Sequence, residues 1–316
     1  MWWVSGPVPI VIPAHNEGAV LRRCIETVLD DAQSDEFAVL VVSNGSTDNT
    51  VALARQVGAE LGHRVEVIEV AAASKIAALR AADVRLRATT AEPRIYLDAD
   101  VLLSAEGARR LAGVLRTDRP RLALARIDID TAGASWIVRQ YYRAWELTGY
   151  INRQDAGSGV FAMNQAGADR VHPLPDVIND DGYVARCFSA DEKVVCEVRF
   201  RSFAARSAGA LIRRRARIVN GNRQLDALVR RPAGPAVAGG PAFDLFGAVR
   251  GRELPPTAAA VFVAITVAAR ALAAWRRLTG ATATWSTDTS TRVAAADQPA
   301  PETTGPPMPD RKGSGS

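Results

Sequence analysis

The first 130 residues alternate short apolar runs with longer amphipathic segments, and this alternation limits the possible fold more than any other feature. The apolar runs have consecutive Val, Ile and Leu residues, typical of strands buried on both faces of a parallel sheet. We therefore predict an α/β, Rossmann-like, mostly parallel sheet with helices on both faces. The predicted strands are Val8–Pro13, Phe37–Val42, Val65–Val70 and Arg94–Leu97; the helices are one that ends near Leu29, then Thr50–Leu61, Ser74–Leu86 and Ala105–Leu115.

The sequence of the second half predicts fewer helices and strands. An aromatic-rich helix is expected over Ser135–Leu147 and a basic helix over Ala208–Arg217. Gly159–Met163 and Val194–Phe200 have the composition of strands. We place a loose boundary near residue 130 and expect the two parts to fold together.

The C-terminal region predicts an apolar helix over 254–278 and a disordered tail over 279–316. The stretch Thr257–Trp275 is rich in alanine, contains Arg270 and is followed by two arginines. A membrane span needs about 20 apolar residues, so a helix packed on the protein or lying on a membrane surface is favoured over a span. The tail has almost no large apolar side chain with which to offset its ordering entropy.

Cysteine use and the start of the chain indicate a reducing compartment. Cys24, Cys187 and Cys196 form no CxxC pair and have no histidine cluster nearby, which argues against a disulfide scaffold or a zinc module. The first residues lack the basic and apolar segments of a signal peptide. We expect a cytoplasmic protein, either free or at the inner face of the cell membrane.

Polar clusters follow the four predicted strands of the first half. Ligands of parallel α/β sheets bind beyond the carboxyl ends of the strands, so these clusters predict one shared site. The clusters are Pro13-Ala14-His15-Asn16-Glu17, Ser43-Asn44-Gly45-Ser46-Thr47-Asp48, Ala73-Ser74-Lys75 and Asp98-Ala99-Asp100.

Asp98 and Asp100 are the most informative of these residues. Like charges two positions apart at a strand end repel each other unless a cation joins them. A hard divalent ion such as Mn²⁺ or Mg²⁺, bound by oxygen and bridging to phosphate, is the natural cation. Ser104 is the better N-cap for the following helix, which leaves both aspartates free for a metal.

Three further residues combine local structural roles with candidate site roles. Asp48 or Ser46 is expected to cap the helix that follows them, and Glu17 to lie in the first turn of its helix. Lys75 opens a helix, where a cation is mildly unfavourable. A lone lysine there in an arginine-rich chain suits a phosphate contact.

Together these segments resemble the family 2 glycosyltransferases, which have the GT-A fold. Residues 1–130 would then form the nucleotide-sugar (donor) half, and 131–253 the acceptor and catalytic half of the same domain. The resemblance implies a nucleotide-diphosphate-sugar donor and a divalent metal at Asp-x-Asp. It is carried, in the family's order, by Val11-Ile12-Pro13-Ala14-His15-Asn16-Glu17, Val41-Val42-Ser43-Asn44-Gly45-Ser46-Thr47-Asp48-Asn49-Thr50, Ala73-Ser74-Lys75-Ile76-Ala77-Ala78-Leu79 and Tyr96-Leu97-Asp98-Ala99-Asp100.

The resemblance also implies roles for single residues. Glu17 and Asn44 would contact the nucleotide, and Asp100 would hold the metal with Asp98 near the ribose or the metal. Family members commonly have two aspartates where this chain has Ser43-Asn44, so the base preference of the site stays open. The implied donor-binding residues are Pro13, His15, Glu17, Asn44, Ser46, Lys75, Asp98 and Arg217, and the implied metal ligands are Asp100 and Asp98.

Asp180 and Asp181 are the candidate catalytic residues. In the family, an acidic pair at about this place supplies the general base that deprotonates the acceptor. A positioned carboxylate opposite the leaving diphosphate suits that task, and the neighbouring like charge could raise one pKa toward the working range. The alternative is a helix N-cap. We favour the base, with Asp181 ahead of Asp180.

The run Arg213–Gly221 resembles the family's Gln-x-x-Arg-Trp-x-x-Gly element at Arg217 and Gly221 only. Arg214 and Ile218 replace Gln and Trp, which argues against a processive polymerase. Clustered arginines could hold the departing diphosphate or form a solvated basic helix face.

We therefore expect a non-processive, actinobacterial-type, metal-dependent glycosyltransferase that acts with inversion in cell-wall or polysaccharide biosynthesis. The acceptor is a polysaccharide, a lipid-linked or a small molecule, and residues 257–277 are a candidate peripheral membrane contact. The alternatives are a sugar-phosphate nucleotidyltransferase, which usually has a Gly-rich loop after the first strand, and a non-enzymatic binding protein for anionic ligands. Nucleic acid is not expected, because the arginines are not interleaved with stacking aromatics.

Overall fold

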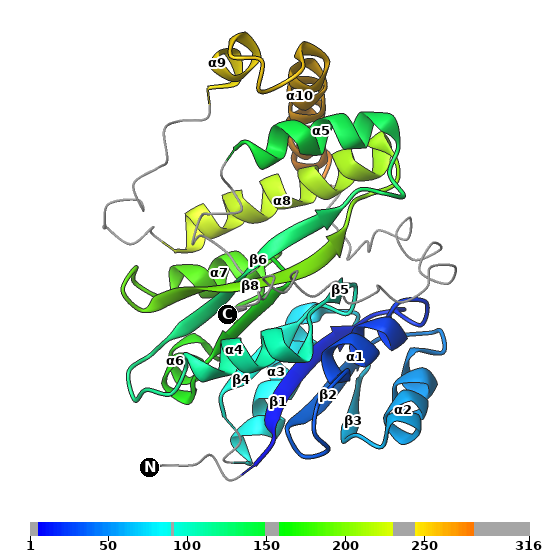
Figure 1. Ribbon diagram of the computed structural model, residues 1–316, viewed down its shortest axis with the longest axis vertical. Helices are drawn as coiled ribbons and strands as arrows, with labels where there is room; N and C mark the ends of the chain where they lie inside the picture. The colour runs from blue at the N-terminus through cyan, green and yellow to red at the C-terminus, as the bar shows by residue number, and fades with distance from the viewer. Residues whose placement is uncertain (1–5, 90–91, 149–157, 230–243, 281–316) are drawn as a thin grey trace, which may run out of the picture.

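The computed structural model describes residues 6–89, 92–148, 158–229 and 244–280. The predicted disordered tail falls almost entirely outside these described residues. Within them, the chain forms a curled sheet of eight strands with helices on both faces (Figure 1). The strand order is β3-β2-β1-β4-β7-β6-β8-β5. The strands are β1 (Val8–Ala14), β2 (Phe37–Asn44), β3 (Val65–Val70), β4 (Arg94–Leu97), β5 (Val101–Leu102), β6 (Leu122–Asp130), β7 (Val160–Met163) and β8 (Lys193–Phe203).

The first four strands are parallel and confirm the predicted α/β layer. β1 pairs with β2 on one side and with β4 on the other, and β2 pairs with β3. Residues of β1 alternate between two apolar cores, with Ile10 and Ile12 in one and Val11 in the other. Because both faces are covered by helices, β1 and β2 are apolar at consecutive positions, as the sequence indicated, whereas the edge strand β3 carries Glu66 and Glu69 and is only half-buried.

The second half of the sheet differs from the prediction. β7 runs antiparallel to both β4 and β6, so it joins the early strands to the late ones. β6 was not predicted, although its alternation of Ile127 and Ile129 with polar residues is typical of a strand with one exposed face. It pairs in parallel with β8, which pairs antiparallel with the short β5.

The predicted helices occur in the expected order, and α6, α7 and α9 are present in addition to them. Helix α8 continues for three turns beyond Arg217, the predicted end, because no Pro interrupts it and Ala216, Gly221 and Leu225 are buried along it. Helix α1 begins at Leu21, so the expectation that Glu17 lies in its first turn is wrong. The helices are α1 (Leu21–Leu29), α2 (Thr50–Leu61), α3 (Lys75–Arg87), α4 (Ala105–Gly113), α5 (Trp136–Glu146), α6 (Gln165–Val171), α7 (Asp180–Arg186), α8 (Ala208–Leu228), α9 (Leu245–Arg250) and α10 (Pro256–Leu278).

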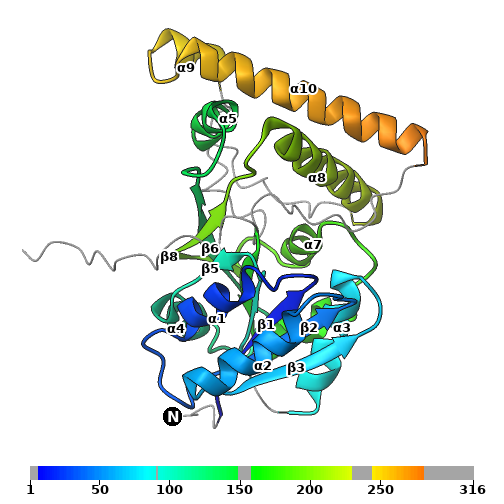
Figure 2. The same cartoon turned by 90° about the vertical axis from the view of Figure 1, so that its right-hand side faces the viewer.

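Helices α5, α8 and α10 form a separate layer above the sheet. Figure 2 shows α10 as the outermost element, lying across α5 and α8. Tyr141 of α5 stacks on Phe262 of α10 with ring centroids 5.1 Å apart. Ala144, Leu254 and Ala258 form a small apolar core between α5 and the start of α10. The predicted C-terminal apolar helix is therefore present, and it packs on the protein with one face.

Candidate active site

Lys75 lies at the centre of the candidate site and joins its two halves. The residue opens α3, where Ser74 caps the helix by accepting a hydrogen bond from the Ala77 amide. The Lys75 ammonium lies 2.7 Å from Oδ1 of Asp98 and 2.8 Å from Oδ2 of Asp180. Asp98 follows β4 and Asp180 opens α7, so a single cation holds the end of an early strand against a late helix.

Gly159 joins the same two segments through its backbone. Its N–H donates to Oδ2 of Asp181 at 2.6 Å, and its carbonyl accepts from the Asp98 N–H at 2.9 Å. Its φ of +103° is a conformation that residues with a side chain rarely adopt. A Cβ here would also lie 3.2 Å from Oδ2 of Asp98. A glycine is therefore required between the two carboxylates, and it fixes the orientation of Asp181.

The acidic pair of α7 is not used as the helix cap. Asn179 is the N-cap, and its Oδ1 accepts a hydrogen bond from the Gly182 N–H at 2.9 Å. Asn222 of α8 accepts a 2.7 Å hydrogen bond from Asn179 Nδ2, which holds the cap in place. The carboxylates of Asp180 and Asp181 are thus left to face the site at the positive end of α7.

Helix α8 braces the segment that leads into α7. Gln224 accepts from the Ile178 N–H and donates to the Asp176 carbonyl, both at 2.9 Å. A Cβ at Gly221 would lie 3.1 Å from Cβ of Asn179, so the two backbones approach closely there. Arg217 lies one turn before Gly221 on the same face of α8, which directs it toward the start of α7.

The charges of this cluster determine its protonation. Burial disfavours the Lys75 ammonium, yet the surrounding carboxylates outweigh burial and raise its pKa well above the ordinary value. Burial, together with the charge of Asp180, raises the pKa of Asp181 to about 7, while Lys75 opposes that shift. Oδ1 of Asp181 is buried and has no hydrogen-bond partner among the described residues. Asp181 therefore has a free oxygen and a pKa suited to exchanging a proton near neutral pH.

The loops after β1 and β2 lock together beside this cluster. Asn16 has a φ of +53°, and its Oδ1 accepts from the Thr47 N–H at 2.8 Å. Ser46 Oγ accepts from the Asn16 N–H at 3.1 Å, and Asp48 accepts from the Gly18 N–H at 3.1 Å. The predicted donor residue Ser46 thus fixes the loop conformation. The N-cap of α2 is Asn49, and Asp48, one residue earlier, accepts from the Thr50 N–H at 3.0 Å.

Asn44 ends β2 with its side chain enclosed. Its carbonyl oxygen lies 2.6 Å from Nδ1 of His15, which ties the loop after β1 to the end of β2. Its side-chain Oδ1 and Nδ2 are both buried and have no hydrogen-bond partner among the described residues. An unsatisfied buried amide costs about 1–3 kcal/mol, which is recovered when a ligand pairs with it. Pro13 is buried in β1, and Glu17 is buried below the loop.

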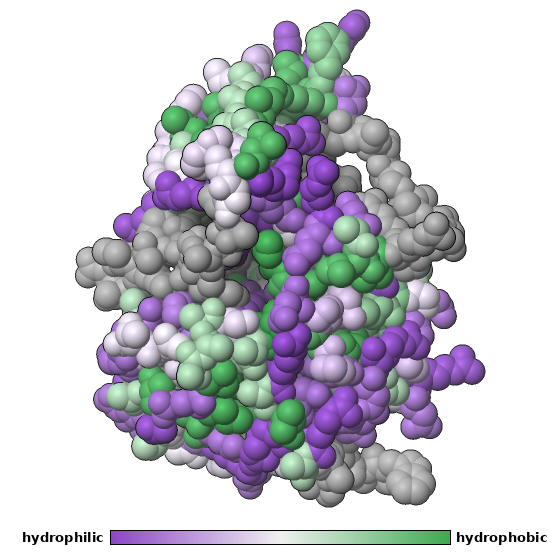
Figure 3. Space-filling model, turned by 180° about the vertical axis from the view of Figure 1, so that it is seen from behind, coloured by the Kyte–Doolittle hydropathy of each residue, from purple (hydrophilic) through white to green (hydrophobic). Residues whose placement is uncertain are grey.

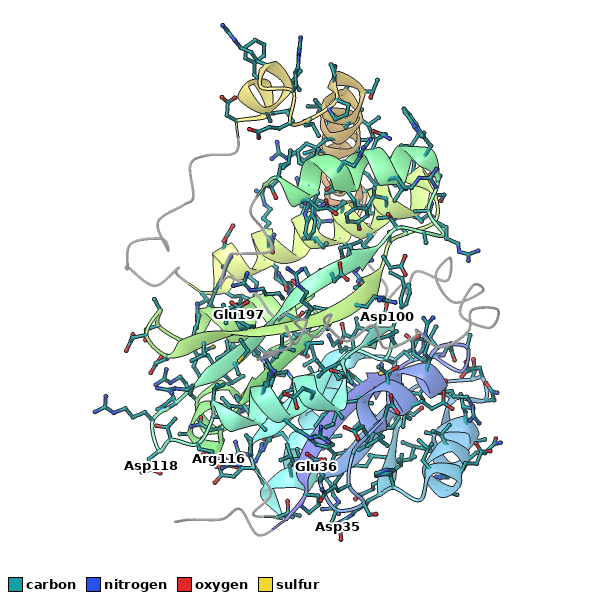
Figure 4. All side chains as sticks on the ribbon, viewed as in Figure 1. Asp35, Glu36, Asp100, Arg116, Asp118 and Glu197 are labelled. Atoms are coloured by element: carbon teal, nitrogen blue, oxygen red, sulfur yellow. The ribbon has the colours of Figure 1, made fainter. Side chains whose placement is uncertain are left out.

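Asp100 lies apart from the lysine-centred cluster, in the turn between β4 and β5. It is exposed, and Figure 4 shows it at the level where the lower α/β layer meets β8. Burial raises the pKa of the Cys24 thiol, and the negative charges of Asp100 and Asp98 raise it further. Both carboxylates therefore lie close enough to Cys24 to affect its pKa. The idea that Asp98 has no structural partner is wrong, because Lys75 binds it.

The residues present fit a divalent cation that is completed by substrate. No group of three or more His, Cys, Asp or Glu side chains able to hold a metal occurs in the part of the chain that the structure describes. Mg²⁺ in phosphate-transfer sites commonly binds one or two carboxylates, with phosphate and water as its other ligands. Asp98 and Asp100 are two such carboxylates at the end of β4, of which Asp98 is also bound by the Lys75 ammonium.

Comparison with known proteins identifies the family. The sequence profile described as "Glycosyl transferase family 2" matches residues 10–168, half of the chain. The chain belongs to glycosyltransferase family 2. The matched region contains all four strand-end clusters and Gly159. No curated protein matches the sequence closely enough to add to this assignment.

Solved glycosyltransferases of the GT-A type resemble this family 2 member in fold. A mannosyltransferase from Pyrobaculum calidifontis, solved with GDP-mannose and Mn²⁺, is 20% identical with a TM-score of 0.56, over 94% of this chain and 89% of its own. Glucosyl-3-phosphoglycerate synthase from Mycobacterium tuberculosis, solved with Mn²⁺, UDP and glucosyl-3-phosphoglycerate, is 18% identical with a TM-score of 0.41, over 62% and 71%. S. aureus TarS with UDP-GlcNAc is 13% identical with a TM-score of 0.45, over 62% and 58%.

Sequence reasoning did not foresee the positioning roles of three asparagines at the site. Asn16, Asn179 and Asn222 each bind the backbone or another side chain at a loop that carries candidate residues. Asn tolerates positive φ and is a preferred N-cap, so Asn16 and Asn179 had local signals. Asn222 had none, because its partner lies 43 residues earlier in the chain.

Proposed function

We propose that this family 2 member transfers a sugar from a nucleotide-diphosphate-sugar to an acceptor hydroxyl with inversion at the anomeric carbon, with Asp181 as the general base. The acceptor oxygen bonds to the anomeric carbon as the bond from that carbon to the diphosphate oxygen breaks. The acceptor proton passes to Asp181, and the nucleoside diphosphate leaves. One bond forms per encounter, in keeping with the incomplete match to the element of processive enzymes.

The environment of Asp181 is the observation that carries this proposal. Its Oδ2 is held by the Gly159 N–H, so its orientation is fixed, while its Oδ1 is left without a partner among the described residues. Its pKa of about 7 lets it accept a proton near neutral pH and release it afterwards. Asp180 is engaged by Lys75 at 2.8 Å, which makes it a positioning residue rather than the base.

The donor side of the proposal uses the strand-end loops. Asn44 would pair with the nucleotide base through its unsatisfied amide, and His15, Ser46 and Asn16 hold the surrounding loops in place. Pro13 in β1 and Glu17 in the turn after it would support the donor side from below the loop surface, since both are buried there. Arg217, on the α8 face directed toward α7, would bind the departing diphosphate, because a fixed guanidinium matches phosphate oxygens.

Metal dependence is part of the proposal, with Asp100 and Asp98 as the protein ligands of Mn²⁺ or Mg²⁺. A divalent cation bound there supplies positive charge that stabilises the leaving diphosphate. Lys75 contributes a fixed positive charge next to Asp98 whether or not a metal is bound. We expect cytoplasmic action with no nucleic-acid partner, and the acceptor is a polysaccharide, a lipid-linked or a small molecule. Family membership disfavours a nucleotidyltransferase or a non-enzymatic binding protein.

The test is sugar transfer measured with UDP-, GDP- and dTDP-sugars, with Mn²⁺ or Mg²⁺ and with a chelator. The GDP-mannose and Mn²⁺ bound by the Pyrobaculum neighbour make that pair a first choice for screening. With the active donor, Asp181→Asn should lower kcat by about 100- to 10,000-fold while donor affinity changes little.

Asp35→Asn, on an exposed turn remote from the site, is the matched control and should keep full activity (Figure 4). A product with retained anomeric configuration would contradict the single displacement. Full activity of Asp181→Asn would reject Asp181 as the base.

A further inference from the structure

The outward face of α10 is a continuous apolar stripe. With 100° between residues, the exposed positions of the helix fall on one arc, and the buried positions Ala258, Ile265, Ala269 and Ala273 fall on the opposite one. From Ala260 to Leu278 the stripe is about 27 Å long at 1.5 Å per residue. Its exposed members are Ala260, Val263, Ala264, Val267, Ala271, Trp275 and Leu278.

The opposite face of α10 is committed to the protein. Phe262 stacks on Tyr141, and the Arg277 guanidinium donates to Asn220 Oδ1 of α8 at 2.8 Å. By length and composition α10 could cross a membrane, with mean hydropathy 1.9 over its most apolar 18-residue window, of which 28% is buried. A helix held along one side by α5 and α8 presents only its other side, so in this packing it can lie on a bilayer but not cross it (Figure 2).

The charges around the stripe are those of a surface for anionic lipid. α10 carries Arg270, Arg276 and Arg277 and no acidic residue. Arg270 borders the stripe, where its long stem can lie along apolar surface while its charge reaches a headgroup. Arg250 and Arg252 are exposed at the neighbouring end of α9 and the turn that follows it, where the exposed Glu253 offsets one of the two charges.

Aromatic residues mark both ends of the same surface. Trp275 is 57% exposed near the C-terminal end of α10, and Phe246 of α9 is 76% exposed near the other end. Tryptophan is enriched at the headgroup level of bilayers, because its ring is apolar and its N–H is polar. Figure 3 shows apolar and weakly polar residues gathered over α9 and α10 at the upper end of the molecule.

We propose that α9 and the outward face of α10 form a docking surface for an anionic lipid bilayer, with α10 lying in the plane of the interface. The apolar stripe enters the headgroup–acyl boundary while Arg250, Arg252 and Arg270 bind lipid phosphates. This surface stands independently of the transfer reaction, since none of its residues belongs to the proposed catalytic or donor site. A membrane-bound acceptor would be encountered by an enzyme held in this way.

The test is co-sedimentation of the full chain with phosphatidylcholine vesicles, with or without about one third phosphatidylglycerol. The wild type should pellet with the anionic vesicles and much less with the neutral ones, and salt should weaken the binding. Val263→Glu combined with Val267→Glu should weaken partitioning by about a hundredfold. Val84→Glu, at a 71% exposed valine on α3, is the matched control and should bind as the wild type does.

Three results would overturn the proposal. One is equal pelleting of the double variant and the wild type, and another is absence of binding to anionic vesicles. The third is a wild-type dimer in light scattering that the double variant loses, which would assign the stripe to a second copy of the chain. Sugar transfer to a soluble acceptor and the thermal unfolding profile should be unchanged in the double variant, which separates loss of docking from loss of fold or of activity.

Discussion

The ammonium of Lys75 lies 2.8 Å from the Asp180 carboxylate and 2.7 Å from that of Asp98. These residues come from the first turn of α3, the first turn of α7 and the end of β4. The Lys75 ammonium therefore lies between the proposed donor-binding residues and the helix that carries the proposed general base. It lowers the repulsion among carboxylates that would otherwise oppose a negatively charged diphosphate.

Replacing Lys75 by Met should shift the pH dependence of transfer as well as its rate. Lys75 opposes the rise in the Asp181 pKa, so its loss should raise that pKa further. At pH 7 less of the base is then ionised, and kcat/KM should fall by about fivefold for the first unit by which the pKa rises. Lys193→Met, at the start of β8 near the opposite edge of the sheet, is the control. An unchanged pH midpoint in Lys75→Met would contradict this coupling.

The wild-type pH profile should report Asp181 directly. Burial and Asp180 raise its pKa to about 7, so the base is protonated below that pH and ionised above it. We expect kcat/KM to rise about tenfold per pH unit in acid and to level off above about pH 7. Steady-state kinetics across that range, with stability checked separately at each pH, measures the midpoint. A midpoint near 4, the ordinary value for Asp, would show that a different or less buried group is the base.

Asp100→Asn should remove the metal-dependent part of donor binding. The amide keeps the size of the side chain but loses the charge that favours a divalent cation. Titration calorimetry with the donor should therefore show wild-type affinity increased by Mn²⁺, and Asp100→Asn affinity nearly the same with and without it. Asp118 is an exposed residue at the left of Figure 4, on the opposite side of the view from Asp100, and Asp118→Asn should behave as wild type. Full Mn²⁺ dependence in Asp100→Asn would reject Asp100 as a ligand.

Asn44→Ala should weaken binding of the nucleoside diphosphate itself. The side chain has two unsatisfied polar atoms, and each hydrogen bond to a base contributes about 0.5–1.5 kcal/mol, so a loss of about tenfold in affinity is expected. Asn49→Ala, on an exposed Asn that makes no capping bond at the start of α2, is the control. Equal affinity of Asn44→Ala and wild type for UDP and GDP would show that the nucleotide base does not bind at Asn44.

The early strands and their polar ends could be predicted because the signals are local. β1, β2 and β4 have apolar residues at consecutive positions, and parallel order brings the carboxyl ends of all four early strands to one edge. His15, Asn44 and Asp98 were therefore expected near one another without knowledge of the rest of the chain. Lys75 was expected beside them for the same reason, since it follows the third strand directly.

The contacts across the two halves could not be predicted from local signals. The distance of Asp180 from Lys75 depends on β7 entering between β4 and β6, and the sequence of β7 does not state its neighbours. The need for a glycine at position 159 follows only from its backbone contacts with Asp98 and Asp181, which lie far from it in the sequence. Glu17 was misplaced because its turn is held by Thr50, which is 33 residues away.

Asp83→Ala should strongly destabilise the fold while leaving the site chemistry intact. Arg94 is fully buried in β4, and its Nη1 donates to Oδ1 of Asp83 at 2.8 Å. Removing the carboxylate leaves a buried cation without its counter-charge, which costs about 3–5 kcal/mol in the free energy of unfolding. Urea unfolding followed by circular dichroism measures this loss.

Two further variants serve as controls for this prediction. Asp169→Ala, which removes an exposed partner of Arg87, should cost far less. The double variant Asp83→Leu with Arg94→Leu should recover most of the lost stability. A loss in Asp83→Ala no larger than that in Asp169→Ala would show that water or Gln165 already compensates the Arg94 charge.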